Sequence, residues 1–241
     1  MGSVSTLRSV TTALFLLFGS LPALAQSLPF EVGVTGGIPM TETIRGYQNG
    51  GRFGGYQAES ATRRYVAGGT AGARLSSRFS VSAGLLYRRF GYDYDAWNGL
   101  PVPLVYTHYR GTGASWEVPA LMRWKVVQRR SMAPFAALGA SYRRLAGMKE
   151  TPTIYDNFFP NNPRVIPQPA SGTPRLLENR NAIAPLVAGG VEFRQGWLII
   201  TPEIRYTRWC SDTLGGFLQP LRWNRRQLDF LLGIGIPFGR H

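Results

Sequence analysis

The sequence predicts an all-β fold, an eight-stranded antiparallel up-and-down transmembrane β-barrel. Three observations lead to this prediction. Eight segments alternate apolar and polar residues with a period of two, an export signal precedes them, and their connections are alternately very short and very long. A barrel that spans a membrane turns its apolar side chains to lipid and its polar side chains to its own lumen.

The first 25 residues are typical of a secretory signal peptide. Arg8 precedes an apolar stretch at 13–18, and the small-x-small pattern at 23–25 is typical of a cleavage site. The apolar stretch is too short to cross a bilayer as a helix, which takes about 20 residues. We therefore expect a signal peptide at 1–25 and one outer-membrane β-barrel domain at 26–241.

Alternation is clearest near the C-terminus. Segments 198–209 and 227–238 each have one face that is almost wholly apolar, while the opposite face carries Glu203 and Arg205, then Gln227 and Asp229. Most of the segments exceed the length of a soluble strand and match the roughly 9–11 residues of a tilted transmembrane strand. The eight predicted strands are 30–39, 65–75, 79–92, 113–126, 133–145, 182–194, 197–209 and 226–238.

The connections fall into two length classes. Tight turns are predicted at 76–78, 127–132 and 195–196, and long loops rich in Gly, Pro, Asn and Tyr at 40–64, 93–112, 146–181 and 210–225. Strict alternation places every long loop at one end of the barrel. This is the outer-membrane arrangement of short periplasmic turns and long external loops, and a soluble lipocalin-like barrel has no reason to sort its loops in this way.

The positions of the charged residues show which face of each strand points into the lumen. In 116–126, one set of alternate residues is apolar or aromatic and the other includes Glu117, Arg123 and Lys125. A charge that faces lipid at mid-membrane costs about 2–4 kcal/mol, so the charged set is expected to point inward. The same argument places these residues in the lumen: Glu31, Arg74, Arg88, Arg143, Glu192, Glu203, Arg205 and Asp229.

These strand motifs resemble the small outer-membrane β-barrel domain family, with its PorT-like and OmpA/OmpX-like eight-stranded barrels. The motifs are Trp-Glu-Val-Pro-Ala-Leu-Met-Arg-Trp at 116–124, Ala-Gly-Gly-Val-Glu-Phe at 188–193, Pro-Glu-Ile-Arg-Tyr at 202–206 and Leu-Gly-Ile-Gly-Ile-Pro-Phe at 232–238. The resemblance implies location in the cell outer membrane, contact with its lipid, and insertion by the outer-membrane insertion machinery. We expect a monomer that binds no nucleic acid.

The charge is strongly positive, with 27 Lys and Arg against 13 Asp and Glu, and almost all of the basic residues are arginine. In an exported protein the acidic partners are lipid phosphates and surface polysaccharide, and the planar guanidinium group suits phosphate well. The strands meet the long loops at Arg63, Arg64, Arg89, Arg144 and Arg226. This rim is predicted to bind lipopolysaccharide or another acidic glycan. Alternatively, half of each Arg-Arg pair turns into the lumen and the rest extend toward the interface.

The lumen is predicted to be filled by ion pairs, because eight strands enclose little more than their own side chains. Opposite charges in such a tube should pair, since an unpaired buried charge is very costly. The alternative is a narrow channel that prefers anions or small solutes. The predicted lumen network consists of Glu117, Arg123, Glu192, Glu203, Arg205 and Asp229.

The sequence predicts no catalytic residue, no cofactor and no metal site. Its only histidines are His241 at the end and His108, which is expected in a solvated loop. Barrel lipid A deacylases pair a histidine with a serine two residues later, where Arg110 stands here. We expect a non-enzymatic structural or surface-interaction protein, with a lipid-modifying enzyme as a weaker alternative. The aromatic cluster at 155–159 is expected to fold back over the barrel mouth or to contact a partner.

Overall fold

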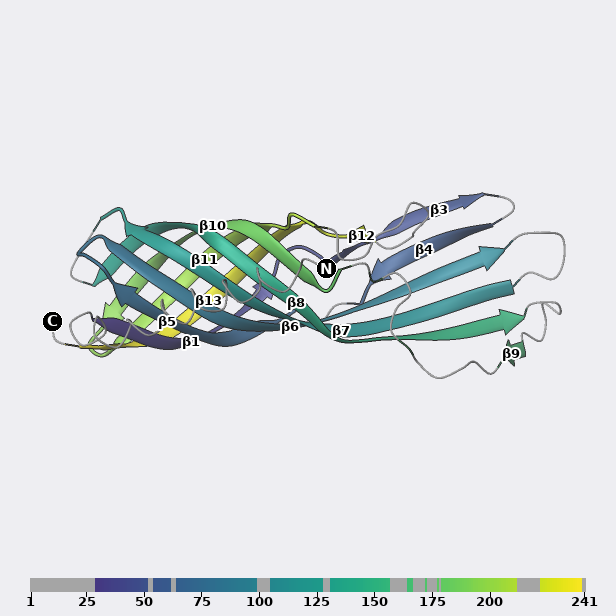
Figure 1. The fold of residues 1–241 in the computed structure, drawn as a ribbon, viewed down its shortest axis with the longest axis horizontal. Coiled ribbons are helices and arrows are strands. Elements are labelled where there is room, and N and C mark those ends of the chain that lie inside the picture. The colour runs from purple at the N-terminus through teal and green to yellow at the C-terminus, as the bar shows by residue number, and fades with distance from the viewer. Residues whose placement is uncertain are drawn as a thin grey trace, which may run out of the picture.

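The computed structural model describes residues 29–51, 54–61, 64–98, 105–127, 131–156, 164–166, 172, 177, 179–211 and 222–239. They form a barrel, and part of the barrel wall continues beyond one end as an open sheet (Figure 1). The predicted signal peptide, Arg63 and residues 157–159 lie outside the described residues. Within the described residues, no helix is long and apolar enough to cross a membrane.

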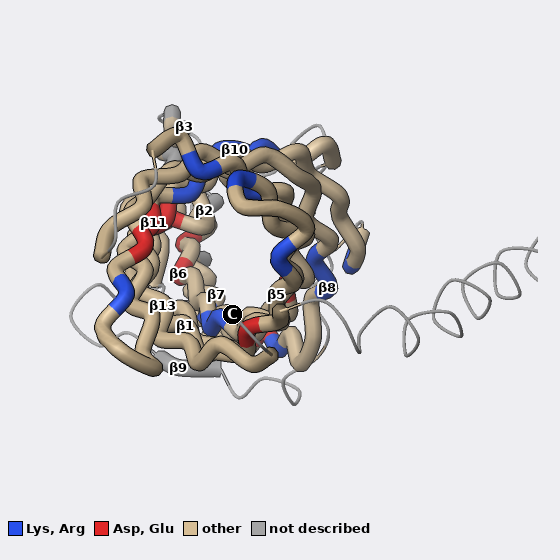
Figure 2. Tube along the Cα trace, turned by 90° about the vertical axis from the view of Figure 1, so that its left-hand side faces the viewer, with Lys and Arg blue, Asp and Glu red and all other residues tan. Residues whose placement is uncertain are grey.

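Eight strands close the barrel, and every neighbouring pair among them is antiparallel. Figure 2 shows the closed ring from one end. The ring returns to its start where β13 pairs with β1, from Phe30 opposite Phe238 to Pro39 opposite Asp229. The predicted fold class is thus confirmed. In chain order the barrel strands are β1 (Phe30–Pro39), β5 (Val66–Arg74), β6 (Phe79–Asn98), β7 (Val105–Lys125), β8 (Met132–Asp156), β10 (Asn181–Gln195), β11 (Leu198–Arg208) and β13 (Arg226–Phe238).

Short turns join the strands at one end of the barrel. Between β5 and β6, the Ser76 hydroxyl accepts hydrogen bonds from the backbone N–H groups of Arg78 and Phe79. Between β10 and β11, Gly196 adopts φ 62°, a conformation that disfavours residues with a side chain. Both turns lie where the short connections are predicted.

The long connections are only partly loops, and here the prediction was wrong. Strands β6, β7 and β8 continue through much of 93–112 and 146–156, and they form an extension that stands beyond the barrel (Figure 1). Its sheet runs in the order β3-β4-β6-β7-β8-β9. The additional short strands are β2 (Ile44–Arg45), β3 (Tyr47–Gly51), β4 (Gly54–Ser60), β9 (Arg164–Ile166) and β12 (Arg222–Trp223).

Cross-strand aromatic contacts explain why these turn-rich segments form strands. The rings of Tyr94 and Tyr109 stack with centroids 4.3 Å apart, and those of Tyr106 and Tyr155 lie 5.7 Å apart. The register between β7 and β8 shifts near Thr112, and Gly147 at φ 59° accommodates the bulge. The ladder therefore continues past the point where the alternation in the sequence breaks.

The outer surface of the barrel is apolar and the interior holds the charges. Along β7, Trp116, Val118, Met122 and Trp124 are exposed, whereas Glu117 and Lys125 are buried. Aromatic residues lie at two levels of the outer surface, as interfacial girdles do. One level contains Tyr87, Trp116, Tyr142 and Tyr206, and the other contains Phe79, Trp124, Phe193 and Phe238.

We expect Leu138→Arg to destabilise the barrel by about 2–4 kcal/mol in a bilayer, because Leu138 is 66% exposed on the apolar surface, between the two levels. Leu138→Ala should cost much less, since lipid can fill the space that the side chain leaves. The measurement is urea unfolding of the protein folded into phospholipid vesicles. A similar small effect of both substitutions would contradict a lipid-facing position.

Candidate functional site

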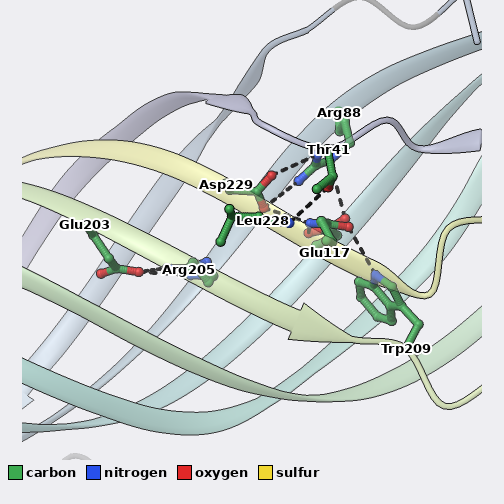
Figure 3. A network of polar contacts seen from close by, with 9 residues as sticks. Thr41, Arg88, Glu117, Glu203, Arg205, Trp209, Leu228 and Asp229 are labelled. Atoms are coloured by element: carbon green, nitrogen blue, oxygen red, sulfur yellow. Dashed lines mark hydrogen bonds and ion pairs between the residues drawn. The ribbon is translucent and has the colours of Figure 1, made fainter.

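The described residues form three clusters of ion pairs in the charged lumen, and the first lies toward the extension. Both guanidinium NH₂ groups of Arg88 donate to the carboxylate of Asp229, at 3.2 and 2.9 Å, and Arg88 Nε lies 3.5 Å from Glu117 Oε1 (Figure 3). Gln227 Nε2 donates to Asp229 at 2.8 Å, and Gln227 accepts a 3.0 Å hydrogen bond from Trp209 Nε1. Strands β6, β7 and β13 thus meet through side chains, together with Trp209, which directly follows β11.

Arg143 lies beside this cluster between two indole rings. Its guanidinium carbon is 4.0 Å from the ring centroid of Trp209 and 4.4 Å from that of Trp223. A cation over an aromatic face is stabilised by the ring quadrupole, more strongly where water is excluded. Arg143 therefore joins β8 and the end of β11 to the short strand β12.

The second cluster lies near the middle of the barrel. Glu203 accepts hydrogen bonds from Arg205 Nε at 2.9 Å and from Arg123 Nη2 at 3.0 Å. The guanidinium group of Arg123 also lies 5.0 Å from the centre of the Phe135 ring. One carboxylate thus joins two cations that come from β7 and β11.

The third cluster lies toward the short turns. Glu192 pairs with Lys125 Nζ at 2.8 Å and accepts a 2.6 Å hydrogen bond from Arg194 Nε. The cavity beside it has a volume of about 40 Å³ and is also lined by Glu31 and Arg74. A further cavity of about 20 Å³ lies beside Glu203 and Arg205. Since about 10–15 Å³ of such cavity volume is enough to hold one water molecule, these two spaces have room for a few water molecules.

An apolar cap covers the end of the barrel toward the extension. Its buried members include Ile44 of β2, Trp223 of β12 and Phe90 of β6, and the Phe90 and Trp223 rings meet edge to face at 5.0 Å. The Tyr92 hydroxyl donates to Glu150 at 2.8 Å within the same cluster. Burial, followed by the charge of Glu150, raises the pKa of Tyr92 above its ordinary value.

The rim arginines lie on the outer surface, just beyond the aromatic level. Arg89 and Arg144 are exposed, and each follows a girdle tyrosine, Tyr87 or Tyr142, by two residues on the same face of its strand. Arg208 follows Tyr206 in the same way. Arg208 is directly opposite Arg226 in the β11–β13 register, and both are exposed. We call Arg89, Arg144, Arg208 and Arg226 the arginine belt.

Arg64 differs from the belt, because it forms a 3.6 Å ion pair with Glu42 in which both side chains are more than half exposed. The structure has examples of the alternative in which one arginine of a pair turns into the lumen. Arg88 and Arg143 turn inward, while the next residue of each pair, Arg89 or Arg144, turns outward.

The predicted lumen residues all lie inside the barrel but do not form one network. Glu117 and Asp229 belong to the first cluster, Arg123, Glu203 and Arg205 to the second, and Glu192 to the third. Arg88, Lys125, Arg194, Gln227 and Trp209 complete the clusters. The inward position of Trp209 could have been predicted from the sequence, because Trp209 continues the alternation that places Glu203 and Arg205 of β11 in the lumen.

His108 does not lie in a loop, as the sequence suggested. It lies in β7 within the extension, where Nδ1 is 2.6 Å from Asp95 Oδ1. Its outward position, opposite the cap, separates it from the lumen. In the part of the chain that the structure describes, no group of three or more His, Cys, Asp or Glu side chains could hold a metal ion.

A closed antiparallel barrel with an apolar outside and an ionic inside is the architecture of integral proteins of the outer membrane. The model of the outer membrane protein beta-barrel domain matches residues 24–208, and this chain belongs to that family. The protein is therefore located in the outer membrane, with its outer surface in contact with lipid.

Several solved structures of bacterial proteins are similar to this chain at low sequence identity. OprG from Pseudomonas aeruginosa is 11% identical over 89% of this chain and 98% of its own, with a TM-score of 0.45. Ail from Yersinia pestis, in complex with the heparin analogue sucrose octasulfate, is 12% identical over 87% and 99%, with a TM-score of 0.38. Neisserial surface protein A is 12% identical over 87% and 97%, with a TM-score of 0.40. No curated protein sequence matches this chain.

We expect Glu203→Gln to lower the free energy of unfolding by about 3–5 kcal/mol, because it leaves the buried guanidinium group of Arg205 and the largely buried one of Arg123 without their shared carboxylate. The matched control is Glu42→Gln, which breaks the exposed pair with Arg64 and should cost about 1 kcal/mol or less. Urea unfolding in vesicles measures both. Equal, small losses would mean that water solvates the charges of the lumen.

Proposed function

We propose that this protein is a non-enzymatic, non-conducting barrel of the outer membrane that interacts with molecules at the cell surface. We further propose that its arginine belt binds the phosphate groups of lipopolysaccharide. The observation that carries the belt proposal is the pair of arginines facing each other across β11 and β13.

Three features of the lumen support the absence of conduction. The ion pairs join strands that are two or three places apart around a narrow tube, two cavities among them have room for only a few water molecules, and the apolar cap lies over one end. The same pairs argue against acid–base catalysis there. Glu117, Glu192, Glu203 and Asp229 each lie within 3.5 Å of an Arg or Lys nitrogen, so each carboxylate is already engaged by a neighbouring cation.

The belt is suited to phosphate by position and by charge. Like charges directly opposite each other in a sheet repel, so Arg208 and Arg226 would be stabilised by an anion bound between them. The tyrosines two residues away place the guanidinium groups at the level of lipid headgroups. Guanidinium–phosphate hydrogen bonds are charge-assisted and frequently bidentate, which gives geometric specificity as well as energy.

In planar bilayers we expect the wild-type protein to give no steady conductance steps, because the ionic clusters and the cap obstruct the lumen. Insertion is checked by heat-modifiable migration of protein recovered from the same membranes, and an open porin serves as the positive control. Reproducible conductance steps from inserted protein would overturn the closed-lumen proposal and favour the narrow-channel alternative.

Replacing Arg208 and Arg226 by glutamine should have opposite effects with and without lipopolysaccharide. In dodecyl maltoside micelles, which contain no phosphate, the variant should be at least as stable as wild type, because the repulsion between the two guanidinium groups is removed. In lipopolysaccharide-containing bilayers wild type should be the more stable, since hydrogen bonds to charged groups contribute about 1.5–3 kcal/mol each. Adding Arg89→Gln and Arg144→Gln should reduce the lipopolysaccharide-dependent gain further. Thermal unfolding measures each case.

The matched control is Arg110→Gln with Lys149→Gln, which removes the same charge from exposed positions in the extension. This control variant should show the same increase in thermal stability in lipopolysaccharide-containing bilayers as wild type does. Bilayers with phosphatidylglycerol distinguish a headgroup phosphate in general from lipopolysaccharide in particular. If lipopolysaccharide raises the thermal stability of the belt variant as much as that of wild type, the belt proposal fails.

A further inference from the structure

The extension has an outward face that takes no part in closing the lumen. Its inward face packs on the apolar cap, so alternation along β6, β7 and β8 turns the intervening side chains away from the barrel axis. The antiparallel register arranges them in rows that run across the strands. Trp97, Tyr106 and Tyr155 form an aromatic row, and beside it Gln57, Asp95, His108 and Thr153 form a polar row.

At one end of the aromatic row, glycine residues without side chains leave room for the ring of Trp97 on the sheet surface. Trp97 is in register with Gly55 of β4, which in turn pairs with Gly50 of β3. A Cβ atom on Gly50 would lie 2.8 Å from the Trp97 ring, so the indole rests directly against the backbone there. The Tyr106 and Tyr155 rings meet at 48° on the next two strands. All three aromatic side chains remain partly exposed to solvent.

The polar row is held in place by its own hydrogen bonds. Asp95 accepts hydrogen bonds from His108 Nδ1 at 2.6 Å and from the Tyr106 hydroxyl. Burial, followed by the hydrogen bond to Asp95, raises the pKa of Tyr106 to about 12. In the next row, Arg110 Nε donates to Asp93 at 3.0 Å. Side chains that are already ordered lose less conformational entropy when a ligand binds.

The charge of this face differs from that of the rest of the protein. The chain carries a net charge of +14, yet Glu59, Asp93 and Asp95 gather here. Among the described residues of this face, the cations Arg110 and Lys149 do not outnumber them. An anionic polysaccharide would be attracted to the arginine belt, but it would meet carboxylates on this face. The chemistry of the face therefore suits a partner that is rich in hydrogen-bond donors and carries no negative charge.

We propose that the aromatic and polar rows form a binding site for an uncharged glycan. The apolar C–H face of a pyranose ring stacks on the exposed faces of Trp97, Tyr106 and Tyr155, whose π-systems are electron-rich. The hydroxyl groups along the edge of the sugar donate to Asp95 and exchange hydrogen bonds with Gln57 and His108. Adjacent strands are about 4.8 Å apart, so the aromatic row spans roughly two or three linked sugar rings.

An apolar protein surface is a poorer occupant of this site. It would cover the carboxylates of Asp93 and Asp95 without supplying hydrogen-bond donors, and burying such groups is costly. A sugar covers the rings and supplies hydroxyl donors at the same time. The glycan site is also independent of the arginine belt, which lies at the level of the lipid headgroups on another part of the surface.

The test uses the full chain in lipid nanodiscs and immobilised oligosaccharides of glucose, galactose, mannose and N-acetylglucosamine, with their sulfated forms as comparison. Wild type should bind one or more of the uncharged chains and should bind the sulfated form of the same chain less well at this site. Tyr106→Ala and Asp95→Asn should each weaken binding of the uncharged chain about tenfold, as the loss of one stacking or charge-assisted contact implies. Tyr106→Phe keeps the ring, so it should retain more affinity than Tyr106→Ala.

The belt variant with Arg208→Gln and Arg226→Gln is the matched control and should bind the uncharged chains as wild type does. Heat-modifiable migration confirms that each variant is folded. If Tyr106→Ala fails to fold, the single variants Asp95→Asn and Tyr106→Phe test the glycan site in its place. The proposal is overturned if no uncharged oligosaccharide binds, or if binding is unchanged in both Asp95→Asn and Tyr106→Ala. It is also overturned if only sulfated chains bind and the belt variant loses that binding.

Discussion

The pairing of charges inside a tube of eight strands is the constraint on which the rest of the structure depends. A charged side chain cannot face hydrocarbon without a cost of about 2–4 kcal/mol, and eight strands leave little room for water inside. The acids and bases of the barrel must therefore meet in the lumen. Arg88 with Asp229, Arg123 with Glu203 and Lys125 with Glu192 satisfy this requirement at successive depths. Closure of the barrel and obstruction of its lumen thus follow from the same cause.

The fold could be predicted because a transmembrane barrel imposes a strict period of two on its strands. The bounds of β1 and β13 agree with the alternation at 30–39 and 226–238, and the inward position of Glu117 and Arg205 follows from phase alone. Which charges pair could not be read in this way. Partners such as Arg88 and Asp229 come from strands far apart in the sequence, and the stagger of the strands determines which side chains reach the same depth.

The extension could not be predicted because its strands are stabilised by cross-strand contacts and not by contact of an apolar face with lipid. Outside the membrane no lipid enforces alternation, and segments rich in Gly, Asp and Tyr are typical of loops. Contacts such as Tyr94 on Tyr109 stabilise strands there, but they form only once two segments are in register. The bulge at Gly147 also changes the phase, so the inward residues of β8 switch from odd to even positions. For this reason Tyr155 points away from the cap, and the prediction that its aromatic cluster folds back was wrong for this residue.

The unequal length of the strands has a consequence for access from outside the cell. Strand β8 has 25 residues and β11 has 11, and at about 3.4 Å per residue the difference is roughly 45 Å of strand. The belt lies at the level of the headgroups, where the sugars of lipopolysaccharide would cover it. The aromatic row lies farther out, because Trp97 follows Arg89 by eight residues on β6, which is about 27 Å along the strand. Large molecules such as antibodies, bacteriophage fibres or proteases would therefore reach the tip of the extension first, while the belt would be accessible only to lipids that diffuse within the membrane.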